Sequence, residues 1–293
     1  MPGKTLISFD YAIKYLLKNK GDYDIVEGFI SALLTSEGYG PVKITALLES
    51  ASNKEEEALK TSIADLVVED KQGQKYIVEI ERQYTDSFIH KACFNTSRLI
   101  VDSISGGQDY TTIKKVFHIS LLYFTYGNMK KPLYHGKTII KEIDNEHPVE
   151  LHIGDQGGKI YDLARIFPEF FLISIPLFDD VIKQEIDEWL YLMKNSEVKE
   201  GFKSPYMQKV SERLNILTMN PKEKDAYYTY LKESLVQRDA VVAAEAKGEA
   251  KGIEIGKVES RIEMAKEMLR DNEKLEKIVK YTKLTAEEIK QLN

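Results

Sequence analysis

Hydrophobic residues at helical spacing open the chain. In the first segment they predict a helix that Ser8 caps, and they lie at Phe9, Ala12, Ile13, Leu16 and Leu17. A second amphipathic helix is predicted over residues 25–34. Glycine and proline at Gly38, Gly40 and Pro41 then end the helical pattern.

Segments rich in β-branched residues follow. Residues 42–48 and 61–68 are predicted strands, and residues 76–81 are a returning strand after a turn at residues 70–73. A helix is predicted over residues 85–104 and a buried strand over residues 115–126. This order of helices and strands predicts an α/β domain with a mixed sheet flanked by helices.

The pattern changes after residue 195. We expect a main domain over residues 1–195, a helical connector over residues 196–240 and a charged helical tail over residues 241–293. Glycines recur every four residues in the tail, and each costs about 1 kcal/mol of helix stability relative to Ala. An apolar stripe in this C-terminal extension predicts homodimerisation, through Ile262, Ala265 and Leu269.

Composition narrows the class of protein. The 293 residues are 43% hydrophobic and 30% charged, which is typical of a globular protein. No apolar run approaches the roughly 20 residues of a membrane span, and the first residues do not resemble a signal peptide, so we expect a cytoplasmic protein without membrane contact. The only cysteine, Cys93, is interpreted as a small buried hydrophobe. The net charge of −6 gives no support for nucleic-acid binding, which draws on Lys and Arg.

Acidic residues interrupt the two strands of the predicted hairpin. Asp65 lies in an otherwise apolar strand, while Glu79 and Glu81 share one face of the next strand. A tight hairpin would bring Asp65 and Glu79 together, and carboxylates held that close need a cation such as Mg²⁺ or Mn²⁺. Acidic residues are equally typical of a hairpin edge that faces solvent. Both interpretations are open at this point.

Several short motifs then occur in a characteristic order. They cover residues 9–14, 60–65, 76–81 and 107–110, and a Gly-Lys-Glu-rich ending covers residues 247–292. Together they resemble the Rpn family of recombination-promoting nucleases, also called transposases, within the PD-(D/E)XK nuclease superfamily. The resemblance extends over nearly the whole chain.

The resemblance implies a restriction-endonuclease-like fold over residues 1–195 and a metal-dependent endonuclease that hydrolyses double-stranded DNA with Mg²⁺ or Mn²⁺. It assigns the metal to the Asp65 and Glu79 carboxylates and the backbone carbonyl of Ile80. Nucleases of this class often add an acid from an early helix, here Glu27. The spacing of Glu27 from Asp24 fits a helix capping box equally well.

The third position of the nuclease motif departs from the family. Lys or Gln is usual there, but this chain has Glu81, which cannot supply positive charge to the reacting phosphate. Three explanations are open: Glu81 binds a second ion, another residue such as Lys60 or Gln83 takes the catalytic role, or the protein is an impaired nuclease acting as an interaction or oligomerisation module. Lys91 and Arg98 lie seven residues apart on a predicted helix, so they either position DNA phosphates or face solvent.

Overall fold

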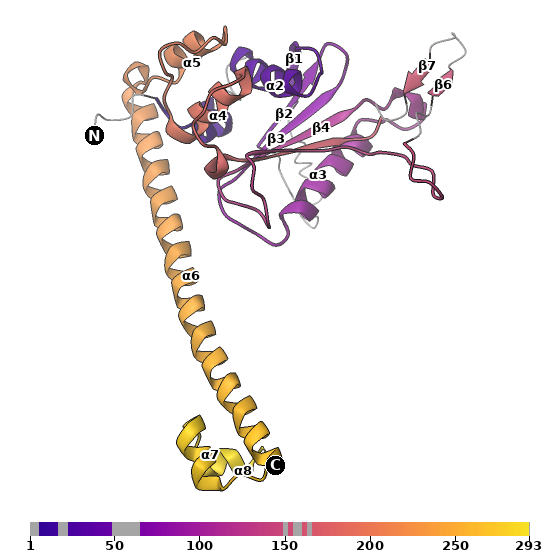
Figure 1. Ribbon diagram of the computed structural model, residues 1–293. Helices are drawn as coiled ribbons and strands as arrows, with labels where there is room; N and C mark the ends of the chain where they lie inside the picture. Colours follow the sequence, from indigo (N-terminus) through magenta and orange to yellow (C-terminus); the bar gives the residue numbers. More distant parts are fainter. Residues whose placement is uncertain are drawn as a thin grey trace. The chain divides into compact units, whose positions relative to one another are not determined.

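The structure, a computed structural model, describes residues 6–16, 23–48, 65–148, 152–154, 160–162 and 166–292 (Figure 1). The chain divides into two compact units, residues 1–227 and residues 228–293. The first unit contains the sheet and the candidate site, and the second is helical.

A six-stranded mixed sheet forms the centre of the first unit, in the order β1-β2-β3-β4-β8-β5. Neighbouring strands are antiparallel from β1 to β3, parallel from β3 through β4 to β8, and antiparallel between β8 and β5. The prediction of a mixed sheet flanked by helices is confirmed. The strands are β1 (Ile44–Leu47), β2 (Leu66–Asp70), β3 (Lys75–Glu81), β4 (Val116–Leu122), β5 (Leu133–Gly136) and β8 (Glu169–Ser174).

The β2–β3 hairpin has the predicted turn. The Asp70 carboxylate accepts hydrogen bonds from the backbone N–H groups of Gln72 and Gln74, at 2.8 and 2.9 Å. Gly73 follows with a φ of +78°, a conformation that glycine adopts without steric cost. Residues 61–64 of the predicted strand lie outside the described part of the chain, and β2 begins at Leu66, one residue after Asp65.

Helices cover both faces of this sheet. Helix α3 (Phe88–Asp102) is the crossover between the parallel strands β3 and β4, as a parallel pair requires, and lies on one face (Figure 1). Helices α2 (Asp24–Ser36) and α4 (Glu185–Asn195) lie on the other face. There Phe9 packs edge to face against Phe29 and Trp189, and all three ring centroids lie 5.7 to 6.0 Å apart.

Two details differ from the sequence-based predictions. The first predicted helix begins as α1 (Phe9–Tyr11) and continues as a π-helix, η1 (Ala12–Leu16). The polar region after residue 130, for which the sequence pattern predicts no strand, contributes the edge strand β5. Shorter elements complete the unit: η3 (Tyr110–Thr112), β6 (His152–Gly154), β7 (Ile160–Asp162), η5 (Ile175–Leu177), α5 (Met207–Arg213) and η6 (Ile216–Thr218).

The second unit folds around its own small core. The long helix α6 (Pro221–Arg270) is followed by α7 (Leu275–Thr282) and α8 (Ala286–Lys290). Ala265, Ile278 and Ile289 are buried together, and Ile262 and Leu269 pack against them. The apolar stripe predicted for self-pairing is therefore covered by α7 and α8 of the same chain. Thr285 and Glu288 form a capping box at the start of α8.

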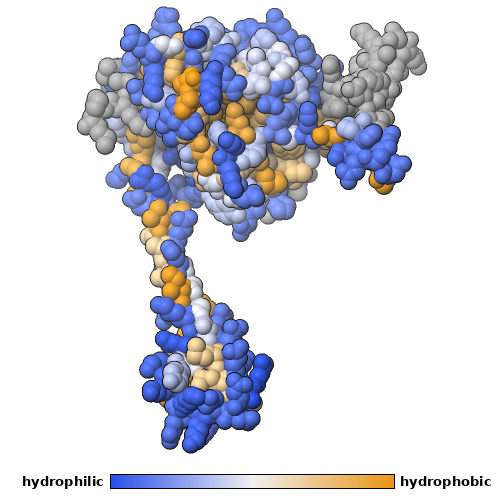
Figure 2. Space-filling view, viewed as in Figure 1, coloured by the Kyte–Doolittle hydropathy of each residue, from blue (hydrophilic) through white to orange (hydrophobic). Residues whose placement is uncertain are grey.

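The surface of the second unit is mostly hydrophilic in the view of Figure 2, apart from apolar patches along α6. Those patches include Leu235, Val242 and Ile253, each about half exposed. Within the described residues, no helix is both long and apolar enough to cross a membrane.

Candidate active site

Three carboxylates gather at the carboxyl end of β3. Asp65 immediately precedes β2, while Glu79 and Glu81 lie in the last residues of β3. Leu66 pairs with Val78, so the next position of the antiparallel ladder sets Asp65 beside Glu79. Val67 and Ile77 share one core cluster with residues of α3, and alternation along the strands assigns Asp65 and Glu79 to that same face.

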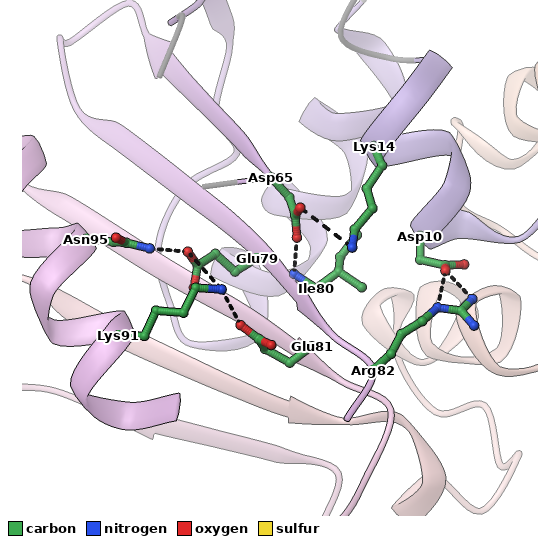
Figure 3. Close-up of polar contacts among 9 residues, drawn as sticks. All are labelled: Asp10, Lys14, Asp65, Glu79, Ile80, Glu81, Arg82, Lys91 and Asn95. Carbon is green, nitrogen blue, oxygen red and sulfur yellow. Dashed lines mark hydrogen bonds and ion pairs between the residues drawn. The ribbon is translucent and has the colours of Figure 1, made fainter. Parts of the chain in front are cut away.

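Asp65 ties the two strands together. Its Oδ2 accepts a hydrogen bond of 2.8 Å from the backbone N–H of Ile80, and its Oδ1 lies 3.7 Å from Lys14 Nζ (Figure 3). About a quarter of the Asp65 side chain is exposed. The carboxylate is thus held beside β3 and still reaches solvent.

Glu79 is the most deeply buried of the three acids, with 1% of its surface exposed. Its Oε1 accepts a hydrogen bond from the Asn95 side chain and lies 4.0 Å from Lys91 Nζ, while its Oε2 lies 3.4 Å from His118 Nε2. Burial raises the pKa of Glu79, but the contacts with His118, Lys91 and Asn95 outweigh burial and leave the pKa lowered. Glu79 is therefore ionised at neutral pH.

Lys91 projects from α3 into this acidic group. Its Nζ lies 2.6 Å from Glu81 Oε1, and Figure 3 shows it between Glu79 and Glu81. Burial lowers the pKa of Lys91, but the hydrogen bond to Glu81 and the charges of Glu79, Glu81 and Asp65 leave it raised. Lys91 remains protonated, and its ammonium faces the carboxylates; a contact with DNA remains a prediction.

The N-terminal motif borders the same site. Asp10 is fully buried and accepts a hydrogen bond of 2.6 Å from Arg82 Nε, and Arg82 lies over the Tyr123 ring at 5.4 Å. Four residues later, Lys14 pairs with Asp65. Sequence reasoning assigned no role to Asp10 or Lys14, although the resemblance had singled out residues 9–14.

Glu27 has a different position from the one expected. Its two oxygens are bonded by Lys43 Nζ at 3.0 Å and by the backbone N–H of Ile44 at 2.9 Å, so Glu27 fixes the start of β1. The alternative of a capping box with Asp24 is wrong, because α2 is capped at Tyr23 without a side-chain hydrogen bond. Glu27 as an accessory metal ligand remains a prediction.

The other candidate residues lie apart from the three carboxylates or outside the described residues. Strand β3 ends at Glu81, so the exposed Gln83 does not continue its face as expected. Arg98 pairs along α3 with Asp102 at 3.5 Å. The predicted burial of Cys93 is wrong, because the thiol is on the exposed side of α3. Lys60 lies outside the described residues.

The donor chemistry of this group fits a hard divalent cation. Carboxylate oxygens are the ligands that Mg²⁺ and Mn²⁺ prefer, and Glu79 Oε2 is buried without a hydrogen-bond donor in the described part of the chain. No three side chains of His, Cys, Asp or Glu converge as a finished ion site in the described ranges. Asp65 is turned toward Lys14 and the Ile80 amide, and Glu79 toward α3.

Comparison with known families agrees with this arrangement. The profile described as "PD-(D/E)XK nuclease family transposase" matches residues 7–153, half of the chain, including all three carboxylates and α3. Comparison with curated proteins and with solved structures gave no match. PD-(D/E)XK nucleases generally use divalent metal ions. The chain belongs to the PD-(D/E)XK nuclease family of transposases.

Proposed function

We propose that the chain is a metal-dependent DNA endonuclease that hydrolyses phosphodiester bonds of duplex DNA, in recombination or in the movement of mobile elements. The observation that carries this proposal is the group of three carboxylates, Asp65, Glu79 and Glu81, set around the ammonium of Lys91. Family membership supports the class of reaction.

Asp65 and Glu79 would hold the metal, with the Ile80 backbone carbonyl as a further oxygen. A divalent cation held there, Mg²⁺ or Mn²⁺, would supply Lewis acidity to a phosphoryl oxygen and to the attacking water. The five charged side chains comprise three acids and two lysines, Lys14 and Lys91, so one negative charge is left to attract a cation. This excess charge supports metal binding.

Lys91 would supply the positive charge that the third motif position lacks. In this chain that position is Glu81, whose carboxylate holds the Lys91 ammonium at 2.6 Å. Helix α3 would therefore provide the ammonium group that the third motif position on the strand usually provides, and Glu81 would orient that ammonium. An ammonium in a partly buried site stabilises the negative charge that develops on a phosphate during hydrolysis. This arrangement supports an active nuclease over an impaired one.

The test is cleavage of supercoiled plasmid by the full chain with Mg²⁺ or Mn²⁺, and with chelator. We expect Asp65→Asn and Glu79→Gln each to reduce cutting to background, because each removes a charged ligand. Glu69→Gln is the matched control, because Glu69 is an acidic residue of β2 outside the site, and this variant should cut like the wild type. Undiminished cutting by folded Asp65→Asn would contradict the assigned site.

The wild-type protein also separates this proposal from the non-catalytic alternative. Isothermal titration with Mn²⁺ should give saturable binding that Glu79→Gln weakens. A wild-type chain that neither binds Mn²⁺ nor cuts DNA would favour an interaction or oligomerisation module built on the nuclease fold.

Self-association would let one assembly cut both strands of a duplex. The surface that supports it is on α6, where Leu235, Val242 and Ile253 are exposed at intervals of seven and eleven residues, which places them on one side of a helix. We therefore propose a homodimer through α6. Light scattering should give the mass of a dimer for the full chain and of a monomer for residues 1–240. An unchanged subunit number would dismiss the idea.

A further inference from the structure

The buried side of Glu79 faces a second polar group. His118, on β4, and Thr96, on α3, are both almost fully buried, with 0% and 1% of their surfaces exposed. His118 Nδ1 lies 2.9 Å from the Thr96 hydroxyl oxygen, and His118 Nε2 lies 3.4 Å from Glu79 Oε2. Thr96, His118 and Glu79 therefore form one line of contacts from helix to sheet.

The imidazole is fixed in this line from two directions. Its ring stacks on Phe170 of β8, with centroids 5.7 Å apart and planes 28° apart. The Thr96 hydroxyl oxygen lies 2.8 Å from the Ala92 carbonyl of α3 and 2.9 Å from His118 Nδ1, so its single proton can be donated to either of these two acceptors. A ring held by both an aromatic neighbour and a hydroxyl has little freedom to turn away from Glu79.

The facing atoms of His118 and Glu79 have no other polar group to bond to in the described part of the chain. Within the described residues, neither Glu79 Oε2 nor His118 Nε2 has a hydrogen-bond partner, and the two buried atoms face each other at 3.4 Å. An ionised carboxylate can only accept hydrogen bonds, so the facing imidazole nitrogen must carry a proton for the contact to be attractive. In a neutral imidazole, a proton on Nε2 makes Nδ1 an acceptor, so the Thr96 hydroxyl donates to Nδ1.

We propose that His118 is a positioning residue for Glu79, with Thr96 fixing the imidazole. Its Nε2–H holds Oε2 on the buried side, so that Oε1 stays turned toward Lys91. The inference rests on the proposed function, in which Glu79 binds the metal. Hydrogen bonds to the outer atoms of a metal ligand orient that ligand, and their loss weakens metal affinity by about 10- to 100-fold.

The experiment measures Mn²⁺ affinity of the full chain by isothermal titration. We expect His118→Ala to weaken binding about 10- to 100-fold. His118→Gln, whose amide can donate to Glu79, should restore most of that affinity, and Thr96→Val should give an intermediate loss while it keeps the shape of the side chain. Ser120→Ala is the matched control, because Ser120 is buried on the same face of β4 and pairs in register with Glu79.

The outcomes separate this inference from the proposed function. Normal Mn²⁺ binding by the wild type together with equal binding by folded His118→Gln, Thr96→Val and His118→Ala would overturn the positioning role alone. Failure of the wild type to bind Mn²⁺ would overturn both proposals. Pulsed electron paramagnetic resonance of the bound Mn²⁺ should reveal no directly coordinated imidazole nitrogen, and a strong nitrogen coupling would replace positioning by direct ligation.

Discussion

The sheet carries a buried acidic residue toward each end, and the two differ in how completely they are paired. Toward the amino end of the parallel strands, Glu169 accepts from Tyr39 at 2.7 Å, from His135 Nε2 at 2.8 Å and from Lys115. Toward the carboxyl end, Glu79 has one buried oxygen without a hydrogen-bond donor among the described residues. Both acids are at least 95% buried, so burial alone does not distinguish them.

The difference separates a structural network from a candidate site. Buried polar groups are normally hydrogen-bonded, and a fully paired group such as Glu169 rigidifies the fold. Incomplete pairing is costly and is kept where a ligand or a reaction needs the free atom. The carboxyl end of β3 has this incomplete pairing, because Glu79 Oε2 has no hydrogen-bond partner among the described residues. Mutations at the two ends should therefore affect different properties.

The largest effect is expected at the fully paired end. Glu169→Ala leaves the buried Lys115 ammonium without its carboxylate, which typically costs about 3–5 kcal/mol of the free energy of unfolding. Urea denaturation measures the change. The matched control is Glu37→Ala, because Glu37 contacts His135 at 2.9 Å but is far more exposed, and such pairs contribute about 0–1 kcal/mol. Equal losses of unfolding free energy in Glu169→Ala and Glu37→Ala would contradict the structural role of the buried Glu169 network.

Lys91 should affect the reaction far more than the fold. We expect Lys91→Ala to reduce cleavage by about 10²–10³, the loss typical of removing one group that stabilises transition-state charge. The exchange Glu81→Lys with Lys91→Glu restores a lysine at the usual motif position and should recover part of the cleavage. Plasmid nicking rates measure both, with His90→Ala, at an exposed position of the same helix, as the control. If the double variant cleaves no faster than Lys91→Ala, Lys91 does not replace the lysine that is usual at the third motif position.

Acid should weaken the site through Glu79. Its folded pKa lies below the ordinary value of 4.5, so its contribution to stability is present above pH 4.5 and is lost as the pH falls through the folded pKa. Glu79→Gln should therefore have a shallower decline of unfolding free energy below pH 4.5, measured by urea denaturation at several pH values. The contribution of Lys91 to stability has the opposite pH dependence: because its pKa is raised, that contribution is present below pH 10.5 and is lost only at higher pH. Identical acid profiles for wild type and variant would refute this assignment.

The smallest effect is expected at Lys14. Its ammonium lies 3.7 Å from Asp65, and both side chains are about a quarter exposed, so Lys14→Ala should change the free energy of unfolding by less than about 1 kcal/mol. Thermal or urea unfolding of the variant provides the check. A cost of several kcal/mol would mean that Asp65 depends on Lys14 as Glu169 depends on Lys115.

The hairpin and its acids could be predicted because their signals are local. Alternation along residues 65–68 and 76–81 gave the strands, the turn and the shared face of Asp65 and Glu79. The cations could not be predicted in the same way. Lys91 enters the site only because the α3 crossover packs on the sheet, and Lys14 comes from a segment fifty residues away in sequence.

The roles of His118 and Cys93 could not be predicted from the residues next to them in sequence. His118 lies in the largely apolar strand β4, where it resembles a core position, and its partners come from α3 and β3. Cys93 was expected inside because cysteine is usually buried, yet the phase of α3 turns it outward while Asn95 and Thr96 turn inward.

That outward thiol has a practical use. Cys93 is the only cysteine of the chain, and it lies two residues from Lys91 on the opposite side of the helix that lines the acidic group. A maleimide fluorophore would therefore attach at one place without engineering, and its emission would report ligand-induced changes in the wild-type protein.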